Sequence, residues 1–343
     1  MLADKVISYA AKMPWALGKT GYHPGYVGKP ELALKIARQL LIGAFYGLIS
    51  DIQTKGITKE AAESLSKKPL VHMQQHISYL DPLISVLAFT DLGLEAPYFA
   101  TGTNLLVGLM STALSRLVGC FPVDRSRLPS GSQQAFRKEP RTITEYTLGL
   151  QDYTKSLLRK RHQILFYPAA TRSRDGFPEH RIGHALTVFG KPIMEFASEH
   201  PELQVVVSAV NYDFNPDIPE FEKQAETGQP QPHKGIIATI GTYMQIPPSE
   251  VLPKAIWNAF AAAEKKADFA KFGKVWISFT QPIAIAEYKG RVGRLAVEIF
   301  SKIKQAVVVT DTALVMAALA DKDGLSRENL EETVSRLHSA LAE

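Results

Sequence analysis

A histidine and an aspartate stand five positions apart in residues 75–82, QHISYLDP, as His76 and Asp81. Histidine titrates near neutral pH and can take a proton from a hydroxyl group. A carboxylate hydrogen-bonded to the second ring nitrogen fixes the tautomer and stabilises the imidazolium. The pair follows a strand-like run and precedes an apolar stretch, so a tight loop could fold Asp81 back onto the ring. The same spacing also fits a capped turn that holds a structural histidine.

Two arginines stand close together in residues 166–174, FYPAATRSR, where a strand-like run ends. A guanidinium binds phosphate or carboxylate through two parallel hydrogen bonds. Arg172 and Arg174 could therefore grip one phosphate from a loop, and Thr171 and Ser173 lie beside them in the sequence. The alternative for this segment is a solvated basic loop.

A third segment, residues 119–125, has the sequence GCFPVDR and ends in Asp124 and Arg125. These two side chains could orient a substrate, or they could form a surface ion pair, which contributes little to stability. Cys120 has no histidine near it in the sequence, so we predict a small buried apolar residue and not a nucleophile.

His72 and His76 have the H-x-x-x-H spacing that binds a metal ion when it lies on a helix. Residues 70–73 suit a strand, however, and a strand would carry the two side chains too far apart. We therefore expect no metal site.

The composition and the charge exclude several classes of protein. With 343 residues, 45% of them hydrophobic and 21% charged, the chain is neither disordered nor collagenous nor a coiled coil. A single cysteine excludes an intrachain disulfide and a multi-cysteine metal site. The net charge is only +5, but residues 116–181 hold 13 Lys and Arg against 6 Asp and Glu. This local surplus predicts an anionic ligand or surface there, and no nucleic-acid-binding motif accompanies it.

Neither the N-terminus nor the apolar runs predict secretion or membrane insertion. Residues 1–26 lack an apolar core followed by a cleavage site. The uncharged run between Glu95 and Arg116 is long enough to span a bilayer, but it contains too many polar residues to face lipid on all sides. We expect a cytoplasmic protein, soluble or attached peripherally to the inner face of the membrane.

Strand-like and helix-like segments alternate through most of the chain, which predicts an α/β fold. The sheet should be mixed, largely parallel and flanked by helices. The predicted strands are residues 70–73, 163–167, 203–210, 236–240 and 275–279, and the predicted helices are 31–50, 104–118, 142–161, 184–199 and 254–270. The Pro-rich residues 215–233 should form a surface loop. We divide the chain into an N-terminal helical region (1–65), a catalytic α/β domain (66–290) and a C-terminal helical segment (291–343).

Taken together and in this order, the three segments resemble the glycerolipid acyltransferase family, whose enzymes acylate glycerol-3-phosphate and lysophosphatidic acid. That family carries the blocks H-x-x-x-x-D, G-x-x-F-x-x-R and F-P-E-G-T-R-S, to which residues 76–81, 119–125 and 166–173 are similar. The resemblance covers about residues 68–285 and includes a late strand, residues 275–279. Three blocks at suitable spacing are far more specific than any one of them.

The sequence departs from the family pattern at several positions. Phe121 stands one place earlier than the family's phenylalanine, and Ala169 and Ala170 replace a Glu-Gly pair. The strand-like residues 205–210, loosely similar to the fourth family block, carry no proline. The soluble plastid type of glycerol-3-phosphate acyltransferase also lacks the glutamate and has both arginines, which in that type hold the acceptor phosphate. In its motifs the chain is most similar to that type.

The resemblance implies transfer of a fatty acyl group from a thioester to a hydroxyl of glycerol-3-phosphate, a step of glycerophospholipid biosynthesis. His76 would be the general base, and Asp81 would orient it. The implied substrate-binding residues are Arg125, Thr171, Arg172, Ser173 and Arg174. The thioester would be that of acyl carrier protein or coenzyme A, a co-substrate and not a cofactor. A plant or algal protein of this type would lie in the plastid stroma.

Two alternatives stay open. The acceptor could be lysophosphatidic acid or another molecule, or the chain could be a catalytically weak protein that binds lipid or an acyl carrier. The acyl tail needs an apolar groove, which the apolar face of residues 104–118 could provide; the same face could instead pack into the core.

Overall fold

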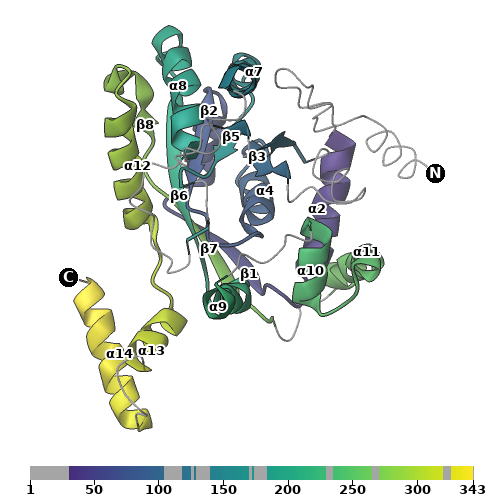
Figure 1. Cartoon of the computed structure of the whole chain (residues 1–343). Helices are drawn as coiled ribbons and strands as arrows, with labels where there is room; N and C mark the ends of the chain where they lie inside the picture. Colours follow the sequence, from purple (N-terminus) through teal and green to yellow (C-terminus); the bar gives the residue numbers. More distant parts are fainter. Residues whose placement is uncertain are drawn as a thin grey trace.

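A central β-sheet runs through the structure, and helices lie on both of its sides (Figure 1). This computed structural model describes residues 31–103, 118–124, 127–128, 140–169, 172–173, 184–228, 235–264, 270–319 and 326–342. Within them, eight strands form one sheet in the order β1-β7-β6-β2-β5-β3-β4, and β8 pairs with β6. The strands are β1 (Asp51–Lys55), β2 (Leu70–Gln74), β3 (Tyr98–Gly102), β4 (Cys120–Val123), β5 (Ile164–Phe166), β6 (Gln204–Tyr212), β7 (Lys274–Phe279) and β8 (Ile283–Ala284).

The pairing in the sheet is mixed and mostly parallel, so this prediction is confirmed. β2 lies between β5 and β6 and is parallel to both, and β3 and β4 continue the parallel set. β7 is antiparallel to β6 and parallel to β1. The carboxyl ends of parallel strands meet at one edge of a sheet, where α/β proteins bind their ligands. The block with His76 follows β2, the block 119–125 contains β4, and the block 166–174 begins at the last residue of β5. All three therefore lie at this edge.

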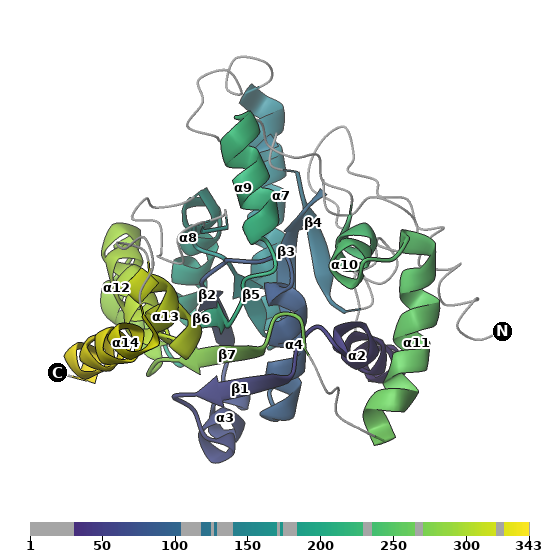
Figure 2. The same ribbon diagram turned by 90° about the horizontal axis from the view of Figure 1, so that it is seen from below.

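Helices cover both faces of the sheet. The described helices are α2 (Glu31–Phe45), α3 (Lys59–Ser66), α4 (Asp81–Asp91), α7 (Pro140–Arg159), α8 (His184–Glu199), α9 (Ile218–Thr227), α10 (Ile236–Met244), α11 (Pro248–Glu264), α12 (Val292–Ala306), α13 (Asp311–Leu319), α14 (Arg327–Ala342) and the 3-10 helix η3 (Ile285–Tyr288). Leu70 of β2 packs into a core cluster with α2, α4, α10 and α11. Its neighbour Val71 packs into a second cluster with α7, α8 and α12. Figure 2 shows the two groups on opposite sides of the strands.

The covered sheet explains why β2 is buried at every position. A strand between two helical layers has no solvent face, so it reads as a short apolar run and not as an alternating pattern. Among the described helices, none combines the length and the apolar character that a bilayer crossing requires.

Two predictions for the segment between β6 and β7 are wrong. Residues 236–240, predicted as a strand, belong to α10, and the predicted loop 215–233 contains α9. A short apolar run fits a buried strand and a buried helix equally well. α9 has a proline in its first turn and ends at Gly228, whose left-handed conformation (φ 64°) is typical of a helix end. Proline and glycine therefore mark the ends of a helix here.

The prediction of helical structure throughout residues 1–65 is wrong for β1. This strand is short and polar, and its pairing with β7, in which Ile52 lies opposite Val275, is a contact distant in sequence. β3 and β4 were also not predicted, and β4 lies inside the third motif segment, 119–125. The predicted helix 104–118 lies outside the described residues except for its last position.

The helices predicted within residues 291–343 are present, but α12 is part of the body of the fold. Leu295, Ile299 and Ile303 of α12 are buried in the second core cluster. α13 and α14 follow it and extend away from the sheet (Figure 1). A helical tail therefore describes α13 and α14 and not α12.

Candidate active site

The first motif block forms a tight loop between β2 and α4, in which Asp81 turns back onto His76. Asp81 Oδ2 accepts a hydrogen bond from His76 Nδ1 at 2.9 Å. The same oxygen accepts the backbone N–H groups of Ile77 and Ser78, at 2.7 and 2.9 Å. The Tyr212 hydroxyl donates to the other oxygen, Oδ1, at 2.8 Å. Four donors thus fix a fully buried carboxylate at the start of α4, where the helix dipole favours a negative charge.

His76 is held at Nδ1, at one face of its ring and at its backbone. Because a carboxylate only accepts hydrogen bonds, Nδ1 carries a proton and Nε2 is left as the basic nitrogen. The ring stacks on that of Tyr167, with 4.2 Å between the centroids and 24° between the planes. The His76 carbonyl oxygen accepts the backbone N–H of Ser173 at 2.7 Å. The first and the FYPAATRSR blocks are therefore in direct contact, and 11% of the His76 side chain stays exposed.

Arg172 lies next to Ser173, and its guanidinium is held by two carboxylates. Nη1 donates to Asp217 Oδ2 and Nη2 donates to Glu220 Oε1, each at 2.8 Å. Nη2 also donates to the Tyr79 hydroxyl at 2.8 Å, and the guanidinium lies 3.6 Å from the centroid of the same ring. Burial opposes the charge, but the two carboxylates outweigh it and hold the pKa of Arg172 above its ordinary value. Phosphate binding by Arg172 stays a prediction.

The remaining predicted substrate residues are only partly described. Ser173 is buried and contacts His76 through its backbone. Arg125, Thr171 and Arg174 lie outside the described residues, so their roles stay predictions as well.

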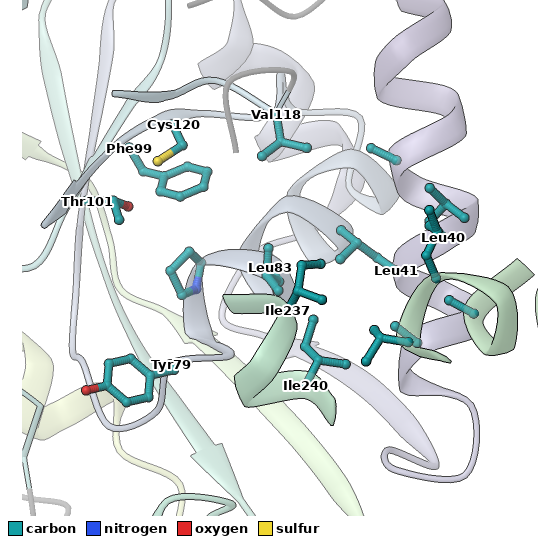
Figure 3. A pocket seen from close by; sticks show the side chains of 16 residues that line it. Leu40, Leu41, Tyr79, Leu83, Phe99, Thr101, Val118, Cys120, Ile237 and Ile240 are labelled. Carbon is teal, nitrogen blue, oxygen red and sulfur yellow. The ribbon is translucent and has the colours of Figure 1, made fainter. Parts of the chain in front are cut away.

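An apolar cavity of about 110 Å³ lies beside the His76–Asp81 loop (Figure 3). Its walls come from α2, α4, α10 and α11 and from β3 and β4, and they include Leu41, Leu83 and Ile240. Tyr79, from the loop itself, lines the cavity, and Figure 3 shows its hydroxyl directed away from the other lining residues. Cys120 is a buried wall residue, which confirms its prediction as a small apolar side chain. The cavity thus reaches the loop that carries the histidine.

His72 is separate from this site. Its ring is fully buried, its Nε2 lies 2.9 Å from Gln163 Oε1, and it packs against Phe89. Burial lowers the pKa of His72 to about 4, so it is neutral at neutral pH. Within the described part of the chain, no three His, Cys, Asp or Glu side chains gather as metal ligands.

The segment that carries these residues matches a known family. Residues 56–211 match the acyltransferase family, and this range includes His76, Asp81, Tyr167 and Arg172. Mitochondrial glycerol-3-phosphate acyltransferase 1 of Bos taurus is 25% identical over 187 residues, which are 52% of this chain and 21% of that protein. The Homo sapiens protein of the same name is 21% identical over 280 residues, 80% of this chain and 30% of that protein. This match and these relatives support the resemblance to the glycerolipid acyltransferase family.

These curated relatives are longer proteins, and the chain spans less than a third of their length. A solved structure, the 1-acyl-sn-glycerophosphate acyltransferase PlsC of Thermotoga maritima, is 13% identical, with a TM-score of 0.41 over 90% of each chain.

The sequence analysis missed two residues of this candidate site. Tyr212 lies at the carboxyl end of β6, two positions beyond the predicted strand, and Asp217 lies just before α9. Tyr212 could have been found, because the carboxyl ends of parallel strands meet at one edge of a sheet and β6 lies parallel to β2, which leads into the His76 loop. Asp217 carries no such signal, because its partners Tyr79 and Arg172 are distant in sequence.

Proposed function

We propose that this protein transfers a fatty acyl group from a thioester to a hydroxyl of glycerol-3-phosphate, with His76 as the general base. The observation that carries the proposal is a buried, four-donor Asp81 that orients His76 in a loop whose Tyr79 lines an apolar cavity. Acyl transfer to an alcohol needs a base and a place for an acyl chain, and both are adjacent here. The matched relatives are glycerol-3-phosphate acyltransferases by name, which supports this acceptor.

The cavity supports the donor side of the reaction. An acyl chain among its apolar walls would end near Tyr79, which lies in the turn between His76 and Asp81, and near Pro82, which follows it. The thioester carbonyl would then lie beside the histidine. Both candidate carriers, acyl carrier protein and coenzyme A, are anionic, and the basic surplus of residues 116–181 would attract either one.

The chemistry needs no protein nucleophile. Nε2 of His76 takes the proton of the acceptor hydroxyl as the hydroxyl oxygen attacks the thioester carbonyl carbon. The tetrahedral intermediate expels the thiolate, which receives that proton from the imidazolium, so the products are an ester and a free thiol. Asp81 stabilises the imidazolium between the two steps through Nδ1. A base placed in this way contributes roughly 100- to 10,000-fold to the rate.

The acceptor phosphate would bind on the side of the FYPAATRSR block. The Ser173 contact with the His76 carbonyl places Arg172 one residue away from the histidine backbone. Arg172, together with Arg125 and Arg174, would hold the phosphate and so place the hydroxyl beside Nε2, with Thr171 and Ser173 close by. Such positioning lowers the barrier because the two reactants meet in a fixed geometry.

The base is tested by His76→Ala. We expect acyl transfer from radiolabelled acyl donor to glycerol-3-phosphate to fall by at least about 100-fold, because the hydroxyl loses its proton acceptor. The matched control is His200→Ala, which removes a histidine from an exposed pair with Glu202 and should keep full activity. Wild-type turnover by folded His76→Ala would contradict the mechanism.

The substrates are tested in one matrix of donors and acceptors. Acyl carrier protein and coenzyme A thioesters are each offered with glycerol-3-phosphate, lysophosphatidic acid and glycerol. We expect product with glycerol-3-phosphate and little with glycerol, which lacks the phosphate. If product forms with lysophosphatidic acid alone, lysophosphatidic acid and not glycerol-3-phosphate is the acceptor. Saturable binding of the donor without product from any acceptor would overturn the proposed function.

A further inference from the structure

Arg172 is paired with two carboxylates that differ strongly in burial. Asp217 is fully buried and accepts hydrogen bonds from Arg172, from the Tyr79 backbone N–H at 2.9 Å and from the Tyr243 hydroxyl. Glu220 leaves 26% of its side chain exposed. Asp217 is therefore fixed from several sides, whereas Glu220 meets Arg172 at the solvent boundary.

The charges in this cluster do not favour an anionic ligand as they stand. One guanidinium faces two carboxylates, so the three side chains sum to a negative charge. Only 9% of the Arg172 side chain is exposed, and Nη2 is occupied by Glu220 and the Tyr79 hydroxyl. Both Nη atoms are engaged, so a phosphate that binds this guanidinium through its two Nη nitrogens must displace a carboxylate. Glu220, the partly exposed carboxylate, meets Arg172 through one hydrogen bond, whereas a phosphate can bind arginine through two parallel ones.

We propose that Glu220 is an exchangeable partner of Arg172, which the phosphate group of the acceptor displaces, while Asp217 keeps the guanidinium oriented. The inference rests on the proposed function, because it assigns the phosphate of that reaction to Arg172. Glu220 lies in the first turn of α9, and its Oε1 also accepts a hydrogen bond from Gln224 Nε2 at 2.8 Å. A change of the Glu220 rotamer would break both contacts of this oxygen and free one N–H of Nη2, while the bond from Nη2 to the Tyr79 hydroxyl could remain. Glu220 thus sets the affinity for the acceptor, and Asp217 is the positioning residue.

Glu220→Gln tests the exchange, because it removes the competing charge and keeps an oxygen for the hydrogen bond. We expect the KM for glycerol-3-phosphate to fall by about three- to tenfold, and by more than kcat changes, because a partly exposed negative charge is removed beside the bound anion. Inorganic phosphate, as a competitive inhibitor, should bind more tightly by a similar factor. Glu222→Gln, on the same helix with an exposed side chain, is the matched control and should change neither value.

We expect Asp217→Asn to change the KM in the opposite direction. It leaves Arg172 without its buried partner, so the KM for glycerol-3-phosphate should rise by at least about tenfold. Asp217→Asn is informative only if circular dichroism shows a folded protein, and Glu220→Gln carries the test if it does not.

An unchanged or higher KM together with unchanged or weaker phosphate inhibition in Glu220→Gln overturns the exchange. This outcome is distinct from a failure of the proposed function, in which the wild type acylates no glycerol phosphate. In that case titration calorimetry with inorganic phosphate decides, since tighter binding to Glu220→Gln than to the wild type supports the exchange and equal or weaker binding rejects it.

Discussion

At the scale of single residues, a histidine beside a carboxylate is a common arrangement in this chain. His162 lies 3.2 Å from Glu95, and His200 lies 3.3 Å from Glu202. Those carboxylates leave 37% and 46% of their side chains exposed, whereas Asp81 is fully buried and has three further donors. His76 therefore differs from the other two histidines in its carboxylate partner, which is buried and accepts further hydrogen bonds.

His72 gives a prediction about pH. Its folded-state pKa of about 4 lies below the ordinary 6.5, because water cannot solvate the charged imidazolium in the buried site and Nδ1 has no hydrogen-bond partner there. Between these pH values the unfolded chain binds more protons, so stability rises with pH across the window. We expect this residue alone to make the protein about 3 kcal/mol less stable at pH 4 than at pH 7. Urea unfolding at several pH values measures the slope.

His72→Gln identifies the source of that slope. Glutamine does not titrate, so the variant should lose most of the difference between pH 4 and pH 7 that His72 contributes. His200→Gln removes an exposed histidine and should leave the slope close to that of the wild type. Parallel pH profiles for His72→Gln and the wild type would contradict the assignment.

At the scale of elements, local patterns predicted what local interactions determine. The spacing of His76 and Asp81 indicated their hydrogen bond, because one loop contains both partners. The buried strands β2, β5, β6 and β7 were predicted because apolar runs mark them. β1 could not be predicted, since this polar segment forms a strand only through its pairing with β7, which is distant in the sequence. The carboxylates around Arg172 could not be predicted either, because they too are distant from it in the sequence.

The packing of α2 on α11 gives a second prediction. Gly43 of α2 faces the backbone of α11, and a Cβ there would overlap the carbonyl oxygen of Ala255. The Asn258 side chain also donates to the Gly43 carbonyl at 3.2 Å. Gly43→Ala must push the two helices apart, so we expect a loss of about 2 kcal/mol or more in the free energy of unfolding. Chemical denaturation measures this loss.

Gly293→Ala is the matched control within a helix. A Cβ at this position of α12 meets no atom within 4 Å, so alanine should leave stability unchanged or raise it by up to about 1 kcal/mol. Equal stability of the two variants would show that α2 and α11 do not pack as closely as described. Because both helices line the cavity, Gly43→Ala also tests how rigid its walls are.

At the scale of the whole molecule, the C-terminal helices contribute unequally to the fold. The described side chains of α14 include none that is buried, whereas α12 buries Leu295, Ile299 and Ile303. We expect a chain that ends at residue 325 to unfold within about 3 °C of the wild type, since it loses little buried surface. Thermal unfolding followed by circular dichroism makes the comparison.

A chain that ends at residue 290 is the contrasting truncation. It uncovers apolar side chains on the sheet and should lose cooperative unfolding, because several buried aliphatic residues are removed at once. A cooperative transition in this shorter chain would place α12 outside the body of the fold.

The pairing of β1 with β7 has a consequence for synthesis on the ribosome. Thr54 is made early and its partner Ile277 late, so β1 waits for most of the chain before it can join the sheet. Until β7 emerges, β6 also presents an unpaired edge, which invites association between nascent chains. Contacts so distant in sequence slow folding. We therefore expect the nascent chain to be more exposed to association over this interval than a βαβ protein whose neighbouring strands follow one another.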